Sequence, residues 1–475
     1  MVTDWVLDEL MEVSTGDPRL DRRVLSTVSM LSAKSDASIL EASPTHKELV
    51  GAYRMLDNVR VQPSHILNPH IKSSIERSIG FQSVTIAHDT TEISVTHAVK
   101  GMGKTTKKKY GCYAHASMAY APDGAPLGLI NADIWTRDST RKTRKTLGKT
   151  GCSKIPFEQR ESYKWLRGTK KVVELAQKYP DTDWINVCDS ESDMYSFYEY
   201  CEGTGLSNLH YVIRACQDMR RTRLTSDPSE EPKTLREQVE LHRAQKPFDV
   251  YTMTIRDRKA PILPANKRHG EQEGREATVE VRRFSVNLCS PVKAKKSSTS
   301  MIRVNVVYLK EAASPQVKTP VEWILITSLP IKTRKDCLRV RKAYEQRWQI
   351  ELYFRILKGG CDVENKKLRD YSRFAKCLSI YMVIAWRIDY ITYVARHDKE
   401  SSCERVFHKK EWQAIEAYFN KGKVRKKKPP KLQELILNIA RLGGYKPRKT
   451  MPGVETIWRG LKMMDPIVYC WILFT

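Results

Sequence analysis

Apolar residues near the start of the chain recur every three or four positions, which predicts helices. After Asp17-Pro18, an N-cap followed by proline at the first helical position, this spacing continues through Leu20, Val24, Val28 and Leu31. A second helix is predicted over residues 45–56, after Ser43-Pro44. Residues 1–75 are therefore predicted to form a helical domain.

Beyond residue 80 the pattern changes to short runs that are rich in β-branched residues. Three consecutive antiparallel strands are predicted over residues 83–97, 112–120 and 126–135, and Ala121-Pro122-Asp123-Gly124 is a strong turn signal between the last two. The basic residues 136–157 are predicted as a loop. A helix over 161–178 and strands over 184–188 and 209–215 follow. The order is β-β-β-α-β-α-β.

The second half of the chain alternates differently. Period-two segments between residues 216 and 320 predict an all-β insertion, and residues 322–328 return to the sheet. Helices are then predicted over 344–358, 371–396, 432–441 and 454–464. Together these elements predict an α/β fold with a ribonuclease-H-like catalytic core over residues 76–370 and a C-terminal helical domain over residues 371–475.

Two acids follow predicted strands. Asp89 ends the first strand and Asp189 follows the fourth. In a ribonuclease-H-like sheet these two strands are neighbours, so both carboxylates would meet at one edge of the sheet.

The predicted helix over residues 344–358 carries a third acid. Tyr344, Arg347, Glu351 and Lys358 stand at offsets that fall within a sector of roughly 60° at about 100° per residue. A carboxylate on that face suits a metal ion, and the cations beside it suit phosphate oxygens. An ordinary solvated face with ion pairs one turn apart fits the same spacing.

Composition narrows the class of partner. The chain has 475 residues, 41% hydrophobic, and a net charge of +27, which points to a polyanion such as nucleic acid. Eleven scattered cysteines form no C-x-x-C pair or zinc spacing, as in a reducing cytosol. Without a signal peptide or an apolar run near 18 residues, the sequence predicts a cytoplasmic protein with no membrane span.

Asp89, Asp189 and Glu351 form the smallest carboxylate set that would hold two divalent ions. Magnesium prefers such oxygen ligands, manganese can replace it, and two ions per site can activate a hydroxyl and stabilise the leaving oxygen of a phosphodiester. The sequence therefore predicts a magnesium-dependent enzyme acting on DNA.

The spacing Tyr344-x2-Arg347-x3-Glu351-x6-Lys358 resembles the YREK signature of bacterial insertion-sequence DDE transposases of the IS-four family. Further blocks resemble the family in the same order: GDPR at 16–19, GAYR at 51–54, DTT at 89–91, VCDSESD at 187–193, EWILITSLP at 322–330 and IARLGGY at 439–445.

The resemblance implies a nucleoid-associated bacterial transposase that binds double-stranded DNA at inverted transposon ends. It also implies a homodimer, in which the C-terminal helical domain over residues 371–475 would take part. Asp89, Asp189 and Glu351 fall on its metal-binding catalytic positions. A 3′-hydroxyl freed at the transposon end would form a hairpin, which water reopens, and would then attack target DNA. The expected DNA contacts are Tyr344, Arg347 and Lys358 at the cleaved end, Trp323 on a flipped base, and Arg19 and Arg54 in the helical DNA-binding domain over residues 1–75.

Three positions depart from the family. Tyr195 replaces a histidine, residues 222–320 match poorly, and the chain ends in IVYCWILFT soon after the final family segment begins, which leaves dimerisation open. Two alternatives remain: a catalytically inactive DNA-binding protein descended from a transposase, and a structure-specific nuclease that cuts without joining.

Overall fold

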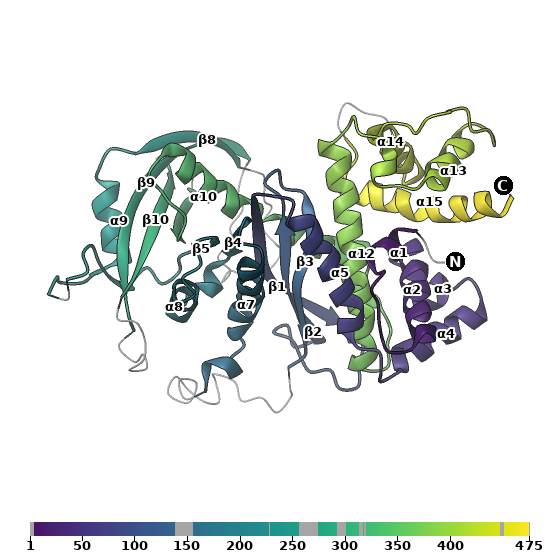
Figure 1. The fold of residues 1–475 in the computed structure, drawn as a ribbon, viewed down its shortest axis with the longest axis horizontal. Helices are drawn as coiled ribbons and strands as arrows, with labels where there is room; N and C mark the ends of the chain where they lie inside the picture. Colours follow the sequence, from purple (N-terminus) through teal and green to yellow (C-terminus); the bar gives the residue numbers. More distant parts are fainter. Residues whose placement is uncertain are drawn as a thin grey trace. The chain divides into compact units, whose positions relative to one another are not determined.

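The computed structural model describes residues 4–137, 155–227, 229–255, 274–291, 301–312, 317, 320–446 and 451–474, so most of the predicted basic loop lies outside the described residues. The chain forms two compact units (Figure 1). Unit 1 comprises Met1–Phe81, Asp89–Pro156 and Gln349–Thr475, and unit 2 comprises Gln82–His88 and Phe157–Trp348. Each unit is described by itself. Unit 1 contains residues from all three predicted domains, so the boundaries of the two units differ from the predicted domain boundaries.

The N-terminal part of unit 1 is helical, as predicted. Its helices are α1 (Asp4–Glu9), α2 (Pro18–Ala33), α3 (Ile39–Ala42), α4 (His46–Asp57) and α5 (Pro63–Ser78). Asp17 caps α2 by accepting a hydrogen bond from the Arg19 N–H at 2.8 Å, and Thr45 caps α4 by accepting one from the Glu48 N–H at 3.3 Å. Both caps satisfy amides that a helix start otherwise leaves unpaired.

Unit 1 also contains strands β2 (Tyr110–Tyr120) and β3 (Pro126–Trp135), which pair antiparallel as predicted. They adjoin β1 (Ser83–Val95), whose residues 89–95 belong to this unit. The long helix α12 (Tyr371–His397) packs against β3, α2, α4 and α5 (Figure 1). The α12 helix is long and apolar enough to cross a membrane by length and composition alone, but 78% of its most apolar window is buried, as in the core helix of a folded domain.

The C-terminal part of unit 1 consists of α13 (Lys409–Phe419), α14 (Leu432–Leu442) and α15 (Val454–Phe474). The α15 helix runs ten residues beyond its predicted end. It crosses α14 closely, because a Cβ atom on Gly460 would lie 1.9 Å from the Ile439 carbonyl oxygen. Ile436, Ile439 and Ile457 are fully buried in the core of this bundle.

Unit 2 is built on a sheet whose first three strands are parallel. Residues 83–88 of β1 lie beside β4 (Asp183–Cys188), and β5 (Leu209–Arg214) lies on the other side of β4. Both contacts are parallel, with Ala87 opposite Val187 and Val187 opposite Val212. Helices α7 (Tyr163–Lys178) and α8 (Tyr195–Gly203) accompany these strands, so the predicted β-α-β-α-β order is present.

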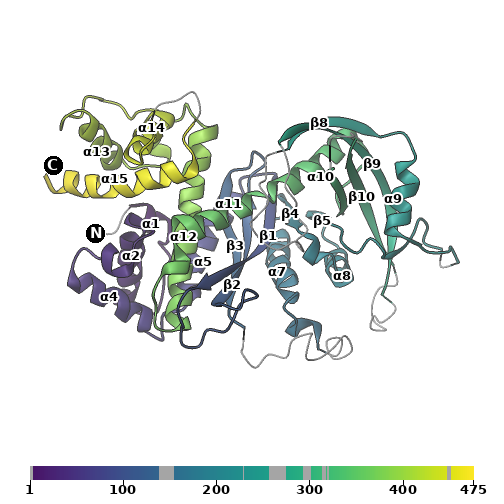
Figure 2. The same cartoon turned by 180° about the vertical axis from the view of Figure 1, so that it is seen from behind.

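The insertion extends this sheet and includes a helix. Beyond β5 the order is β11 (Glu322–Thr327), β10 (Met301–Glu311), β9 (Arg275–Cys289), β6 (Arg221–Arg223) and β7 (Lys233–Thr234), and β8 (Asp249–Ile255) also pairs with β9. The prediction of an all-β insertion was wrong at α9 (Leu235–Arg243) (Figure 2). Thr234 and Glu237 form a capping box there, which favours a helix over a further strand.

The predicted single helix over residues 344–358 is interrupted. Helix α10 (Arg334–Gln346) ends before α11 (Gln349–Arg355), and a π-helical turn (Ile356–Gly360) follows. At the break the Arg347 and Trp348 amides bond three residues back instead of four, which tightens the turn. Trp348, at this break, is 47% exposed. The prediction of one uninterrupted helix over residues 344–358 is therefore wrong.

Candidate active site and nucleic-acid interface

Asp189 stands directly after β4 in unit 2. The strand is buried up to Cys188, and the chain then turns into a short 3-10 helix that Asp189 caps by accepting a hydrogen bond from the Glu191 N–H at 2.8 Å. Burial raises the pKa of this carboxyl, against the lowering effects of that hydrogen bond and of nearby Arg347 and Lys164. A half-buried carboxylate whose negative charge is incompletely balanced is stabilised in its ionised form by a further cation.

Three of the predicted DNA contacts lie together in unit 2. Trp323 is half-buried on β11, and its ring centroid lies 5.2 Å from that of Tyr344 on α10 in an edge-to-face arrangement. The guanidinium carbon of Arg347 lies 5.9 Å from the centroid of the Tyr344 ring. Tyr344 itself is only 6% exposed, and burial raises its pKa, although Arg347 and Arg214 lower it. Its observed role is to support Trp323 from the core.

Unit 1 contains Asp89, Glu351 and Lys358. The Asp89 carboxylate accepts a hydrogen bond from the Thr90 N–H at 2.7 Å. Lys358 lies on the π-helical turn, where burial lowers its pKa, while the charges of Glu364 and Asp89 raise it. Asp89 and Lys358 are therefore electrostatically coupled. Glu351 is half-buried on α11.

The donor chemistry of these residues suits hard divalent cations, because carboxylate oxygens are the ligands that magnesium prefers. Within the described part of the chain, no three His, Cys, Asp or Glu side chains are grouped closely enough to form a metal site. Two neighbours that the sequence did not reveal are Lys164, beside Asp189, and Glu364, whose carboxylate accepts a hydrogen bond from the Ser94 N–H at 2.9 Å.

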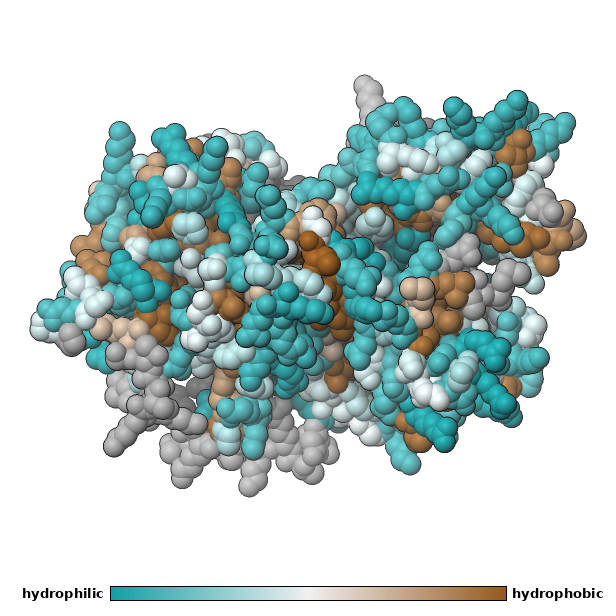
Figure 3. Space-filling view, viewed as in Figure 1, coloured by the Kyte–Doolittle hydropathy of each residue, from teal (hydrophilic) through white to brown (hydrophobic). Residues whose placement is uncertain are grey.

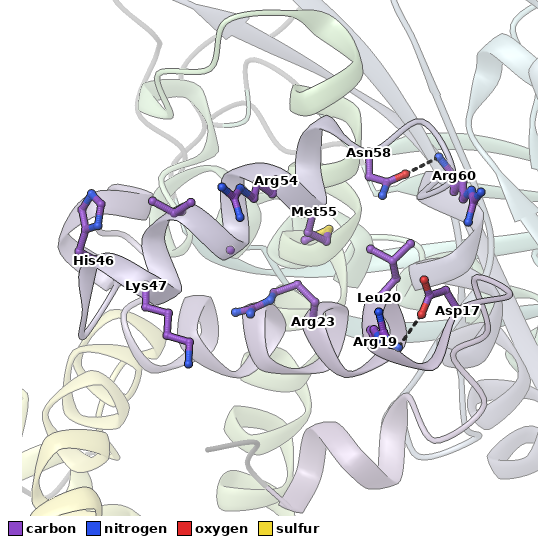
Figure 4. Close-up of a pocket in the computed structure, with 12 residues that line it drawn as sticks. Asp17, Arg19, Leu20, Arg23, His46, Lys47, Arg54, Met55, Asn58 and Arg60 are labelled. Atoms are coloured by element: carbon purple, nitrogen blue, oxygen red, sulfur yellow. Dashed lines mark hydrogen bonds between the residues drawn. The ribbon is translucent and has the colours of Figure 1, made fainter.

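A second candidate site is a groove between α2 and α4 in unit 1, with a volume of about 720 Å³ (Figure 4). Arg19 and Arg23 reach it from α2, Lys47 and Arg54 from α4, and Arg60 from the segment that follows. Arg23 and Arg54 extend into the groove from the two facing helices (Figure 4).

The positive charge of this groove is almost unopposed. Asp17 is the one carboxylate among the described lining residues, and its side chain is already bonded to the start of α2. Across the described chain, no ion pair is present for Arg19, Arg23 or Arg54. A groove with five cations and one occupied acid is suited to phosphate oxygens. The sequence had pointed to Arg19 and Arg54, but only the fold brings Arg23, Lys47 and Arg60 beside them.

An apolar groove lies between α13 and α15. It is lined by Ala414, Ala417, Tyr418, Gly422, Pro466, Ile467, Cys470, Trp471 and Phe474 and has a volume of about 530 Å³. Hydrophobic residues gather over the end of α15 at the right edge of Figure 3. Phe474 is 86% exposed and Tyr418 is 57% exposed, a large apolar surface for one helix pair.

Family comparisons match both ends of the chain. Residues 2–61, which include the arginine-lined groove, match the family model described as transposase DNA-binding. Residues 383–470, which include α13, α14 and most of α15, match the transposase Tn5 dimerisation domain. The second match includes residues 467–470, part of the segment IVYCWILFT that departs from the family.

A solved structure that resembles the chain is the cryo-EM structure of the piggyBac transposase synaptic complex with hairpin DNA. It is 12% identical, with a TM-score of 0.37, over 95% of this chain and 83% of that one. A similarity at that level supports no conclusion about mechanism. The two family matches, in contrast, make residues 2–61 similar to a transposase DNA-binding domain and residues 383–470 similar to a transposase dimerisation domain, which supports a DNA transposase.

Proposed function

We propose that this protein is a cut-and-paste DDE transposase that binds inverted transposon ends, cleaves them and joins their 3′-hydroxyls to target DNA. The observation that carries the catalytic part is the parallel register of β1 and β4. Ala87 pairs with Val187, and Asp89 and Asp189 each follow two residues later along the chain. If this register continues, the two carboxylates would lie at the same edge of the sheet. The strand order β3-β2-β1-β4-β5 supports a ribonuclease-H-like core around them.

In this proposal Asp89, Asp189 and Glu351 would hold two magnesium ions, which manganese can replace. When bound, such ions activate a water or hydroxyl and stabilise the leaving oxygen of the phosphodiester. Arg347 and Lys358 would bind phosphates beside the cleaved bond. Trp323, braced by Tyr344, would stack on an unpaired base while a hairpin forms. The incompletely balanced charge of the half-buried Asp189 carboxylate supports its assignment, because a bound cation would balance that charge.

Cleavage of DNA that carries the gene's own flanking sequences tests the catalytic residues. Asp189→Asn and Glu351→Gln should each abolish magnesium-dependent cleavage yet bind the same DNA as the wild-type protein does. Asp181→Asn, which changes an exposed acid in unit 2, is the matched control and should cleave normally. Normal cleavage by either active-site variant would reject the carboxylate triad.

The same assay separates the alternatives. A transposase joins labelled ends to a target plasmid, whereas a structure-specific nuclease cuts without joining. A catalytically inactive DNA-binding descendant would bind the ends and neither cut nor join them.

For the dimer, we propose that the groove between α13 and α15 packs against a second copy of the chain. Its position inside the dimerisation-domain match and its exposed aromatic residues support this assignment. Trp471→Glu should shift the DNA-bound protein from dimer to monomer in analytical ultracentrifugation, because it places a charge in an apolar interface. A DNA-bound dimer of unchanged affinity would show that the second copy binds elsewhere.

A further inference from the structure

Gly51 occupies the interior of helix α4, where glycine is less favourable than alanine. A Cβ atom built on Gly51 would lie 2.4 Å from Nη1 of Arg23, 2.5 Å from its Cζ and 3.0 Å from its Nε. All three of the nearest atoms belong to one guanidinium group. The space that a methyl group would fill at this position is therefore taken by the charged end of Arg23.

Arg23 is held on α2 with its guanidinium against the backbone of α4. Its carbonyl oxygen accepts hydrogen bonds from the hydroxyls of Ser26 and Thr27, at 3.0 Å and 2.8 Å, so its helix turn is well anchored. No carboxylate of the described chain forms an ion pair with its guanidinium, which lines the groove together with Arg54. A planar, unpaired guanidinium that is already confined loses little freedom when it binds a phosphate.

We propose that Gly51 is a positioning residue for DNA binding: its missing side chain lets Arg23 lie across α4 and present its guanidinium to a DNA phosphate. The inference rests on the proposed DNA-binding role of the groove and adds a residue that cannot touch DNA through a side chain. It also explains why a helix accepts glycine at this position.

The proposal predicts opposite effects of Gly51→Ala on stability and on binding. The methyl group would meet the far end of a flexible side chain, so the guanidinium can move away while the helices keep their places. Alanine also favours the helix. The variant should therefore unfold at a urea concentration no lower than the wild type, yet bind DNA more weakly.

The experiment measures binding of the full-length chain to a fluorescent duplex of the flanking end sequence at several salt concentrations. Arg23→Gln and Gly51→Ala should each weaken binding about tenfold and reduce the salt dependence by about one released counterion. In the Arg23→Gln background, Gly51→Ala should cause no further loss. Arg22→Gln is the matched control, because Arg22 lies on α2 outside the groove and bonds to the Pro18 carbonyl.

Four outcomes would overturn the proposal. Unchanged binding by Gly51→Ala, with weak binding by Arg23→Gln, would remove the positioning role and leave the groove as the DNA site. If Gly51→Ala weakened DNA binding equally in the wild-type and Arg23→Gln backgrounds, the substitution would act by a route other than Arg23. A lower urea midpoint of the Gly51→Ala variant would show that the substitution acts by destabilising the fold. Wild-type binding by both Arg23→Gln and Arg54→Gln would instead reject the groove as the DNA site.

Discussion

The crossing of α14 and α15 gives a sharp test of the packing in the dimerisation domain. Gly460→Ala would place a methyl group 1.9 Å from the Ile439 carbonyl oxygen, whereas ordinary contact begins at 3.4 Å. The helices must separate by roughly 1.5 Å, the difference between these distances. The obstacle is a backbone carbonyl inside a helix, so it cannot rotate away as a side chain would.

The magnitude follows from two opposing effects. Forcing an extra methyl group into a close-packed contact costs about 1–3 kcal/mol, and the rigid obstacle favours the upper end of that range. The higher helix propensity of alanine relative to glycine offsets about 1 kcal/mol of this cost. We therefore expect Gly460→Ala to lower the free energy of unfolding by about 2 kcal/mol, with Leu435, Ile436 and Ile457 in the core that loosens.

Urea unfolding followed by tryptophan fluorescence measures this loss. Gly453→Ala is the matched control, because no atom lies within 4 Å of its built Cβ and its backbone does not require glycine. It should unfold at the wild-type urea concentration. If Gly460→Ala were as stable as the wild type, the close approach of α14 and α15 would be wrong.

Two further stability predictions concern unit 1. His70 accepts a hydrogen bond from the Leu129 N–H at its Nε2 atom (3.1 Å) and lies 2.6 Å from Glu9 at its Nδ1 atom. Burial lowers the pKa of His70 below 6.5, so just below pH 6.5 the imidazole is protonated in the unfolded chain but not in the folded chain. The free energy of unfolding should therefore fall as pH drops below 6.5, and His70→Gln should flatten this part of the pH profile; an unchanged profile would contradict the assignment. Asp370 caps α12 by accepting a hydrogen bond from the Arg373 N–H at 3.0 Å, so Asp370→Ala should cost about 1 kcal/mol in urea unfolding, and no loss would mean that the cap is dispensable.

Local sequence signals determined most of the secondary structure. Asp17-Pro18 predicted the start of α2, and the turn at residues 121–124 predicted the β2–β3 pair, because caps and turns depend on residues close together in the chain. The strand end before Asp189 followed from hydrophobic patterning, but the prediction that Asp89 ends the first strand was wrong, because β1 continues to Val95. The register that aligns those strands agrees with the predicted neighbour relation of β1 and β4. The assignment of these acids to metals remains a prediction.

Only the tertiary structure shows where the predicted helix breaks, which side chains are buried together and which charges share a groove. Periodicity cannot show that the helix predicted at residues 344–358 breaks at Arg347, since three-residue and four-residue backbone bonds follow nearly the same apolar pattern. It also could not show that Tyr344 is buried against Trp323. The groove of α2 and α4 gathers charges from two helices, and Arg23 gains its place there from an absent side chain on the other helix. Such contacts depend on how helices approach each other in space, which no local pattern encodes.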